Sequence, residues 1–254
     1  MTAYLVFDLY GPFASFGDVA VGEYRPTYFY PSKSAILGML AASLGIKRKE
    51  EGLLQALSED LKVAVLVLSS GQLLRDFHTI QVPPKTQLKH RTVSTRKDEL
   101  SFEKQNTIIS TRDYRMDSYY RIAVWSETGA HDLTELQQAL SFPKFTPYLG
   151  RKSCPPALPF KADIIHAENA SNALTKYRLN SDLLKSLLKV DRETKFMIFS
   201  DSTSKNPEGN ESVVHKTVRR DRLVSRKNWQ YGERYEIMQY FGGKDVFQQN
   251  TETN

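Results

Sequence analysis

A long basic segment, Lys85 to Arg115, constrains the fold of this chain more than any other feature. It holds eight basic and four acidic residues, a net charge of +4 in a chain whose total is +6. It contains no glycine, and both Thr92–Thr95 and Thr107–Thr111 favour extended backbone. We therefore predict a long hairpin that projects from a globular body, with a charged tip at Arg96–Glu99.

A hairpin this polar has little apolar surface to bury against its own domain. One interpretation is a solvated surface loop. We favour the other, an arm that becomes ordered against RNA and a neighbouring subunit.

Length and composition indicate a folded protein. With 254 residues, 40% of them hydrophobic, the chain forms one large domain or a domain with an appendage. Its longest apolar run, Ala35–Leu44, is too short to span a bilayer, and the N-terminus has no secretion-signal pattern. Cys154 is the single cysteine, which excludes an internal disulfide and a cysteine-cluster metal site. We expect a cytoplasmic location.

The positive charge is concentrated in two places. His215–Arg234 carries a net charge of +5, so with the arm the two segments supply +9 and all other residues sum to −3. Clustered positive charge on a slightly acidic body indicates a polyanionic partner. Membrane lipid is the weaker alternative, because neither segment has the pattern of an amphipathic helix.

The predicted elements follow a recognisable order. Strands are predicted at 4–9, 63–68, 73–79, 118–125 and 160–165, and helices at 33–44, 50–61 and 133–140. This order predicts an α+β fold of the ferredoxin-like or RRM-like βαββαβ type. Sheets of this type commonly receive single-stranded RNA, but no RNP-type aromatic motif is present and the fold alone does not establish RNA binding.

We divide the chain into three parts. Residues 1–165 form the ferredoxin-like domain with the protruding thumb hairpin at about 80–115. Residues 166–247 form a smaller β-rich C-terminal part, with a partly helical stretch at 169–188, strands at 194–199, 213–224 and 231–241, and a mobile loop at 201–212. Residues 248–254 form a disordered tail.

Two stretches near the N-terminus suggest ligand contacts. The glycine- and proline-containing stretch Gly11–Gly17 is predicted to be a loop that brings backbone close to a ligand. Ser32 is predicted to cap the first helix, which places Lys33 and Ser34 in its first turn as a seat for a phosphate. The aromatic residues around Arg25 either stack on bases or fasten the loop to the core.

Several motifs resemble one known family, the CasD-type subunits of the type I-E CRISPR Cascade complex (RAMP superfamily). The motifs are Gly11-Pro12 with Phe16-Gly17, Arg25-Pro26-Thr27, Pro31-Ser32-Lys33-Ser34 with Leu37-Gly38, Leu74-Arg75-Asp76-Phe77-His78-Thr79 and Thr146-Pro147-Tyr148-Leu149-Gly150-Arg151-Lys152-Ser153-Cys154-Pro155. The resemblance runs from the N-terminus to about Pro155 and is loose after residue 160.

The resemblance implies a ferredoxin-like body with a thumb and a place at one end of a guide RNA (crRNA) filament. In the family the subunit grips the 5′ handle of the crRNA, its thumb meets the adjacent Cascade backbone subunit, and the large PAM-reading subunit docks nearby. Our candidate RNA-binding residues in the body are Arg25, Lys33, Ser34, Arg75, His78, Arg112, Arg151 and Lys152, and those in the arm are Lys85, Lys89, Arg91 and Arg96.

The chemistry-bearing residues leave an enzymatic alternative. The five histidines lack metal-site spacing, so no metal or other cofactor is expected. A metal-independent endoribonuclease that processes repeat RNA is the rival hypothesis, with Lys89 and His90 acting with Tyr28 or Tyr30, as in the type I-C counterpart. The motifs resembling type I-E favour a non-catalytic subunit.

A protein–protein adaptor is the third class. It explains the arm but not the second basic segment, for which RNA backbone, the large subunit and target DNA remain alternatives.

Overall fold

The computed structural model describes residues 1–18, 20–89, 92–177, 195–202 and 213–242. The centre of its main sheet consists of β1 (Thr2–Ala14), β5 (Leu61–Ser69), β7 (Asn106–Ser126) and β8 (Asp163–Ala167). Their order is β8–β1–β7–β5, and each pair is antiparallel. Helices α1 (Lys33–Leu44) and α2 (Glu51–Asp60) connect β1 to β5, and α5 (Leu133–Ser141) connects β7 to β8. This is the ferredoxin-like βαββαβ arrangement, so the predicted fold class is confirmed.

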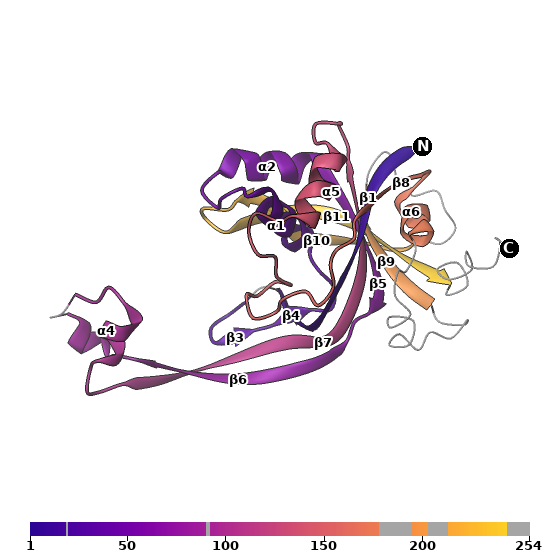
Figure 1. The fold of residues 1–254 in the computed structure, drawn as a ribbon. Helices are drawn as coiled ribbons and strands as arrows, with labels where there is room; N and C mark the ends of the chain where they lie inside the picture. Colours follow the sequence, from indigo (N-terminus) through magenta and orange to yellow (C-terminus); the bar gives the residue numbers. More distant parts are fainter. Residues whose placement is uncertain (19, 90–91, 178–194, 203–212, 243–254) are drawn as a thin grey trace.

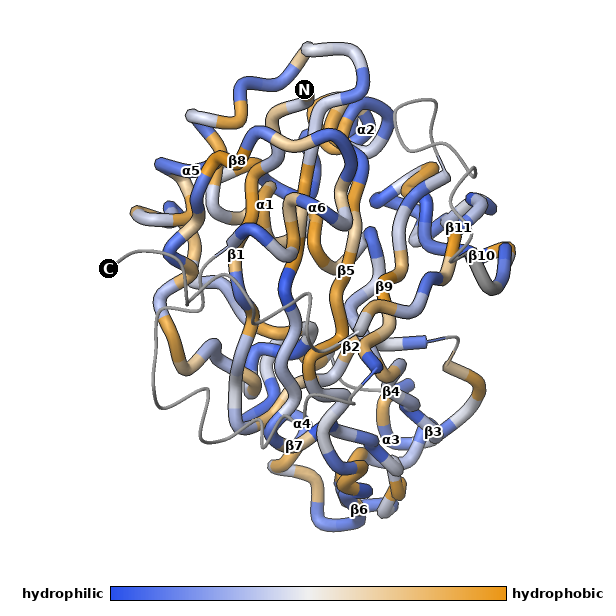
Figure 2. Tube along the Cα trace, turned by 90° about the vertical axis from the view of Figure 1, so that its right-hand side faces the viewer, coloured by the Kyte–Doolittle hydropathy of each residue, from blue (hydrophilic) through white to orange (hydrophobic). Residues whose placement is uncertain are grey.

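The sheet separates two hydrophobic cores. Alternation along β1 sends Leu5, Phe7 and Leu9 into the core beneath α1, α2 and α5, and sends Tyr4 and Val6 into a second core on the opposite face. Helix α6 (Ala170–Lys176) covers that opposite face. Figure 2 shows the hydrophobic residues running along the central strands.

Local sequence signals fix the ends of α1. The side chain of Ser32 accepts a hydrogen bond from the backbone N–H of Ala35, and Gly45 ends the helix with φ 83°. The predicted cap, helix and stop are therefore confirmed. Among the described residues no helix is both long and apolar enough to cross a bilayer.

The predicted C-terminal strands extend the main sheet instead of forming one of their own. Strand β9 (Lys195–Asp201) pairs with the edge of β5, β11 (Gln230–Gly242) pairs with β9, and β10 (Val213–Ser225) pairs with β11. The segment we assigned to a smaller C-terminal part thus completes the hydrogen bonding of the first domain. The proposed tail and most of the proposed 201–212 loop lie outside the described residues.

The thumb is a two-stranded hairpin that leaves the body (Figure 1). Strand β6 (Gln72–Val82) pairs with the first half of β7, from Gln72 opposite Met116 to Val82 opposite Asn106. Its eleven residues span roughly 35 Å. The tip holds two short helices, α3 (Lys85–Leu88) and α4 (Arg96–Leu100).

Two local predictions are wrong. Thr92–Thr95 is not a strand, because Thr95 caps α4 in a capping box with Asp98 and the ladder already ends at Val82. Gly11–Gly17 is not an open loop, because β1 continues through Pro12 to Ala14 in register with β7. Pro12 is tolerated because it makes no ladder pair, while Gly11 and Phe13 pair with Ser118 and Met116.

Three short strands complete the base of the thumb. Strand β2 (Phe16–Gly17) pairs with β4 (Thr27–Tyr28) in a small separate sheet. Strand β3 (Tyr24–Arg25) pairs in parallel with β7.

Candidate nucleic-acid interface

Three of the predicted arginines come together where the thumb joins the body, and we call Arg25, Arg112 and Arg151 the thumb-base cluster. Arg25 lies beside Arg112 in the β3–β7 ladder. The Nη2 of Arg151 donates to the backbone oxygen of Arg25 at 3.1 Å, and its guanidinium lies 4.8 Å from the ring centroid of Tyr114. Arg25 and Arg151 are 126 residues apart in the sequence, yet they lie together in one cationic site.

The loop that supplies Arg151 is fixed by backbone contacts. The N–H of Ser15 donates to the oxygen of Leu149 at 3.0 Å, and the N–H of Leu149 donates to the oxygen of Cys154 at 2.7 Å. Gly150 has φ 85°, and a Cβ atom there would lie 2.0 Å from the oxygen of Ser15. Glycine is therefore required at position 150. In the same loop, the side chain of Lys152 is exposed.

Arg75 is committed to an ion pair on the other face of the hairpin. Its Nε lies 2.9 Å from Asp113 Oδ1, and its Nη2 donates to the hydroxyl of Tyr24 at 3.0 Å. The hydrogen bond from Arg75 lowers the pKa of Asp113 below its ordinary value. Because neighbouring strand residues point to opposite faces, Arg75 and Asp113 face away from Arg112.

The remaining arm residues lie further out. His78 is exposed on β6 opposite Ser110, on the same face as Arg112. Lys85 and Lys89 are exposed in and after α3, and Arg96 is exposed in α4, where it pairs with Glu99. Predicted site residue Arg91 and its neighbour His90 lie outside the described residues.

Lys33 is not a surface contact, so this site prediction is wrong. Its side chain is 4% exposed and its ammonium lies 3.0 Å from Asp201. Burial lowers the pKa of Lys33, while the carboxylate of Asp201 opposes that shift. The first turn of α1, where we predicted phosphate binding, is also occupied, because the backbone N–H of Lys33 donates to the carboxylate of Asp221 at 2.8 Å. Ser34 stays partly exposed and contacts Ser32.

Sequence reasoning missed a buried ionic network between α1 and the C-terminal strands. Its members are three cations and three carboxylates: Lys33, Arg219 and Arg234 with Asp201, Asp221 and Glu236. Two arginines of the second basic segment are thus internal. The signal available in the sequence was the placement of Asp221 and Glu236 within predicted strands; Asp201 begins the stretch predicted to be a loop and gave no such signal.

The residues of the enzymatic hypothesis are not assembled. Tyr30 is 2% exposed, its ring stacks on Phe199, and its hydroxyl donates to Glu236. Tyr28 lies in β4, at the base of the thumb (Figure 1), whereas Lys89 directly follows α3, beyond the end of β6. In the part of the chain that the structure describes, no group of three His, Cys, Asp or Glu side chains is arranged to hold a metal ion.

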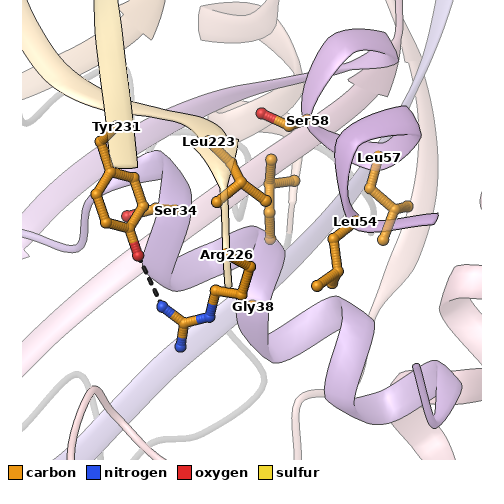
Figure 3. Close-up of a pocket in the computed structure, with 9 residues that line it drawn as sticks. Ser34, Gly38, Leu54, Leu57, Ser58, Leu223, Arg226 and Tyr231 are labelled. Atoms are coloured by element: carbon orange, nitrogen blue, oxygen red, sulfur yellow. Dashed lines mark hydrogen bonds between the residues drawn. The ribbon is translucent and has the colours of Figure 1, made fainter. Parts of the chain in front are cut away.

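Arg226, in the turn between β10 and β11, lines a small cavity beside α2. Its Nη1 donates to the hydroxyl of Tyr231 at 2.7 Å, beside a small cavity of about 60 Å³ bounded by Leu54 and Leu57 of α2 (Figure 3).

The fold is that of a ferredoxin-like α+β protein with a long thumb hairpin. Comparison with known proteins identifies the family to which the chain belongs. A family model described as CRISPR-associated protein (Cas_Cas5) matches residues 4–235. The chain is 34% identical over 186 residues to the CRISPR system Cascade subunit CasD of Escherichia coli (strain K12), covering 70% of this chain and 78% of that one. It belongs to the Cas5 family of CRISPR-associated proteins.

Solved structures agree on the fold. A chain of a CRISPR RNA-guided surveillance complex matches with a TM-score of 0.62 and 24% identity, over 94% of this chain and 89% of that chain. A crystal structure of a Cas protein matches with a TM-score of 0.57 and 20% identity, over 96% and 97%.

Proposed function

We propose that this chain is a non-catalytic RNA-binding subunit of a type I-E Cascade surveillance complex, which grips the 5′ handle of the crRNA. The observation that carries this proposal is the thumb-base cluster, in which three arginines from distant segments meet beside Lys152. Arginine neutralises phosphates, donates two parallel hydrogen bonds to them and stacks on bases. The similarity to CasD supports the assignment to Cascade.

We assign different partners to the two faces of the thumb. The face that carries Arg112 and His78 faces the RNA. The opposite face carries Phe77, which is 72% exposed, together with Leu73 and Ile109 and the internally neutralised Arg75–Asp113 pair. Apolar side chains beside a satisfied ion pair suit a protein neighbour, so this face meets the Cascade backbone subunit.

The second basic segment has a smaller role than its charge suggests. Arg219 and Arg234 are internal, and Arg220 pairs with Glu233. Exposed Lys216 and Arg222 are the positions that we assign to the Cascade large subunit or target DNA.

RNA cleavage is the second candidate function, and the geometry disfavours it. A tyrosine and a lysine must reach the same phosphate to act together. Here Tyr30 is buried, and Tyr28 lies in β4 at the base of the thumb, whereas Lys89 follows α3 beyond the end of β6.

Two gels test the proposal. The purified chain is incubated with 5′-labelled repeat RNA in excess chelator and run on a denaturing and a native gel. Intact RNA with a mobility shift is the expected result. A single defined cut that disappears in His90→Ala would place the chain among the processing nucleases, and no shift at low salt would overturn RNA binding.

A further inference from the structure

A second group of cations lies on the body, where the turn between β10 and β11 meets the connection from α1 to α2. Figure 1 shows α2, β10 and β11 above the thumb. We call this group the turn cluster, and its members are Lys47, Arg48, Lys49, Arg226 and Lys227. All except Arg226 are exposed, and Arg226 is partly exposed. With the neighbouring Glu50 and Glu51 the net charge is +3.

Hydrogen bonds fix the turn against α2. The Nε2 of Gln55 donates to the backbone oxygen of Val224 at 2.7 Å, and the backbone N–H of Lys227 donates to the carboxylate of Glu51 at 3.3 Å. A side-chain hydrogen bond with Ser225 lowers the pKa of Glu51, so this carboxylate stays ionised as an acceptor. The cations of the turn therefore keep a fixed position relative to those of the α1–α2 connection.

Two guanidinium groups share one indole ring. The guanidinium carbons of Arg48 and Arg226 lie 4.0 and 4.1 Å from the ring centroid of Trp229. They cover the ring, which leaves no open aromatic face for a base. Trp229 has φ 54°, a conformation that is uncommon for a bulky residue and occurs preferentially at functional sites. This arrangement brings like charges together on the surface, and an anionic ligand stabilises such an arrangement.

The three lysines of the cluster present their ammonium groups to solvent. The hydrogen bonds that hold these segments use main-chain N–H groups, because Lys47 donates from its backbone to Glu50 at 2.6 Å and Lys227 does the same to Glu51. The two carboxylates nearest in the sequence thus bind the main chain. The exposed side chains of Lys47, Lys49 and Lys227 are therefore suited to contact an external anion.

We propose that the turn cluster binds the phosphate backbone of duplex DNA without reading its sequence. Cations that neutralise phosphates release condensed counterions, and each contact contributes more on a duplex than on a single strand. Proteins that bind single strands add aromatic stacking platforms, which the covered ring of Trp229 does not supply. This inference goes beyond the proposed function, because it concerns a second nucleic acid and uses neither the thumb-base cluster nor Lys216 and Arg222.

An acidic protein segment is the competing ligand for this surface. Lysine is depleted in protein–protein interfaces, whereas three of the five cations here are lysines. Phosphate contacts, in contrast, are made by lysine and arginine alike. We therefore favour DNA, and the experiment includes an acidic polypeptide.

The test measures the binding of a fluorescently labelled duplex of random sequence to the full chain, by anisotropy over a range of salt concentrations. The turn variant combines Lys47→Gln, Lys49→Gln and Lys227→Gln, which leaves the main-chain hydrogen bonds and the covered indole in place. Each duplex phosphate contact contributes about 0.9 to the slope of log affinity against log salt. The turn variant should therefore lower that slope by nearly 3, on the order of one unit for each lysine.

Two controls accompany the turn variant. The exposed lysines Lys161, Lys176 and Lys195, changed together to glutamine, give a charge-matched variant that should keep the wild-type slope on duplex DNA. Binding of the repeat RNA is measured in parallel. There the turn variant should keep the wild-type affinity, because its thumb-base cluster is unchanged.

Three results would overturn the proposal. Equal slopes on duplex DNA for the turn variant and the charge-matched variant would show that the cluster makes no duplex contacts. An equal loss of RNA and duplex binding in the turn variant would place the cluster in the RNA site. Polyglutamate that displaces the duplex as well as unlabelled duplex of equal charge does would identify an acidic protein as the ligand. The proposed function fails separately, if wild type binds no RNA at low salt.

Discussion

The guanidinium of Arg75 meets the carboxylate of Asp113 side by side across the β6–β7 ladder, with Nε 2.9 Å from Oδ1 and Nη2 3.2 Å from Oδ2. Asp113 is 3% exposed, whereas half of the Arg75 side chain is exposed. The pair therefore fixes a buried carboxylate at the point where the thumb leaves the body.

The Arg75–Asp113 pair predicts an acid-sensitive contribution to stability. Because its hydrogen bond with Arg75 lowers the pKa of Asp113 in the folded state, the ionised carboxylate stabilises the fold. This stabilisation is complete above the unfolded-state pKa of about 3.9 and is lost as pH falls through the folded-state pKa. Urea unfolding from pH 7 to pH 3 should show wild type more stable than Asp113→Asn, with the difference shrinking below about pH 4. The control is Asp76→Asn, a substitution at the residue that follows Arg75. If the difference in stability between wild type and Asp113→Asn does not change with pH, the assignment is contradicted.

The thumb-base cluster predicts the salt dependence of RNA binding. Each phosphate contact on single-stranded nucleic acid contributes about 0.7 to the slope of log affinity against log salt. The combined variant Arg25→Gln, Arg112→Gln and Arg151→Gln should therefore lower that slope by about 2. The charge-matched control changes Lys161, Lys176 and Lys195 to glutamine, in or beside β8, α6 and β9, away from the thumb in Figure 1. Equal slopes for the two triple variants would argue against the cluster.

Lys33 predicts a stability effect without a direct RNA effect. Lys33→Ala removes one partner of a buried ion pair and should lower the free energy of unfolding by about 3 kcal/mol. Lys62→Ala, a less buried lysine of the neighbouring strand β5, should change it by less than about 1 kcal/mol. Chemical denaturation compares the two. Equal changes in the free energy of unfolding would contradict the buried ion pair. A lower salt slope of RNA binding in folded Lys33→Ala would show instead that Lys33 contacts RNA.

Gly150 predicts a coupled loss of stability and binding. An alanine there has an unfavourable φ, and its Cβ meets the backbone oxygen of Ser15, which no side-chain rotation relieves. Gly150→Ala should cost at least about 2 kcal/mol of stability and should weaken RNA binding, because the loop carries Arg151 to the thumb base. Gly17→Ala is the matched control, since a Cβ at Gly17 meets nothing within 4 Å. Thermal unfolding and gel shifts of both variants decide the matter.

Most of the fold could be predicted from the sequence because local sequence signals mark its helices and strands. The helix over Lys33–Leu44 has a serine cap and a glycine stop, and the alternation in β1 identifies a two-sided sheet. The tip of the thumb could not be predicted in this way. The same threonines that favour a strand also cap helices, and Thr95 has Asp98 at the correct spacing.

The site was harder to predict because charge alone does not reveal a partner. Lys33 and Arg151 look alike in sequence, yet the carboxylate that neutralises Lys33 is Asp201, 168 positions away. The pattern located the arm and the loop of Arg151, whose place beside Arg25 needed the β3–β7 ladder.

Strand β7 runs without interruption for 21 residues from the thumb into the centre of the sheet. Side chains alternate along it with a period of two, so inserting one residue between the thumb and the body would exchange the two faces of the whole hairpin relative to the core. Length variation within this family's thumbs is therefore expected to occur in the tip between Val82 and Asn106, and any change inside the ladder is expected to add or remove residues in pairs.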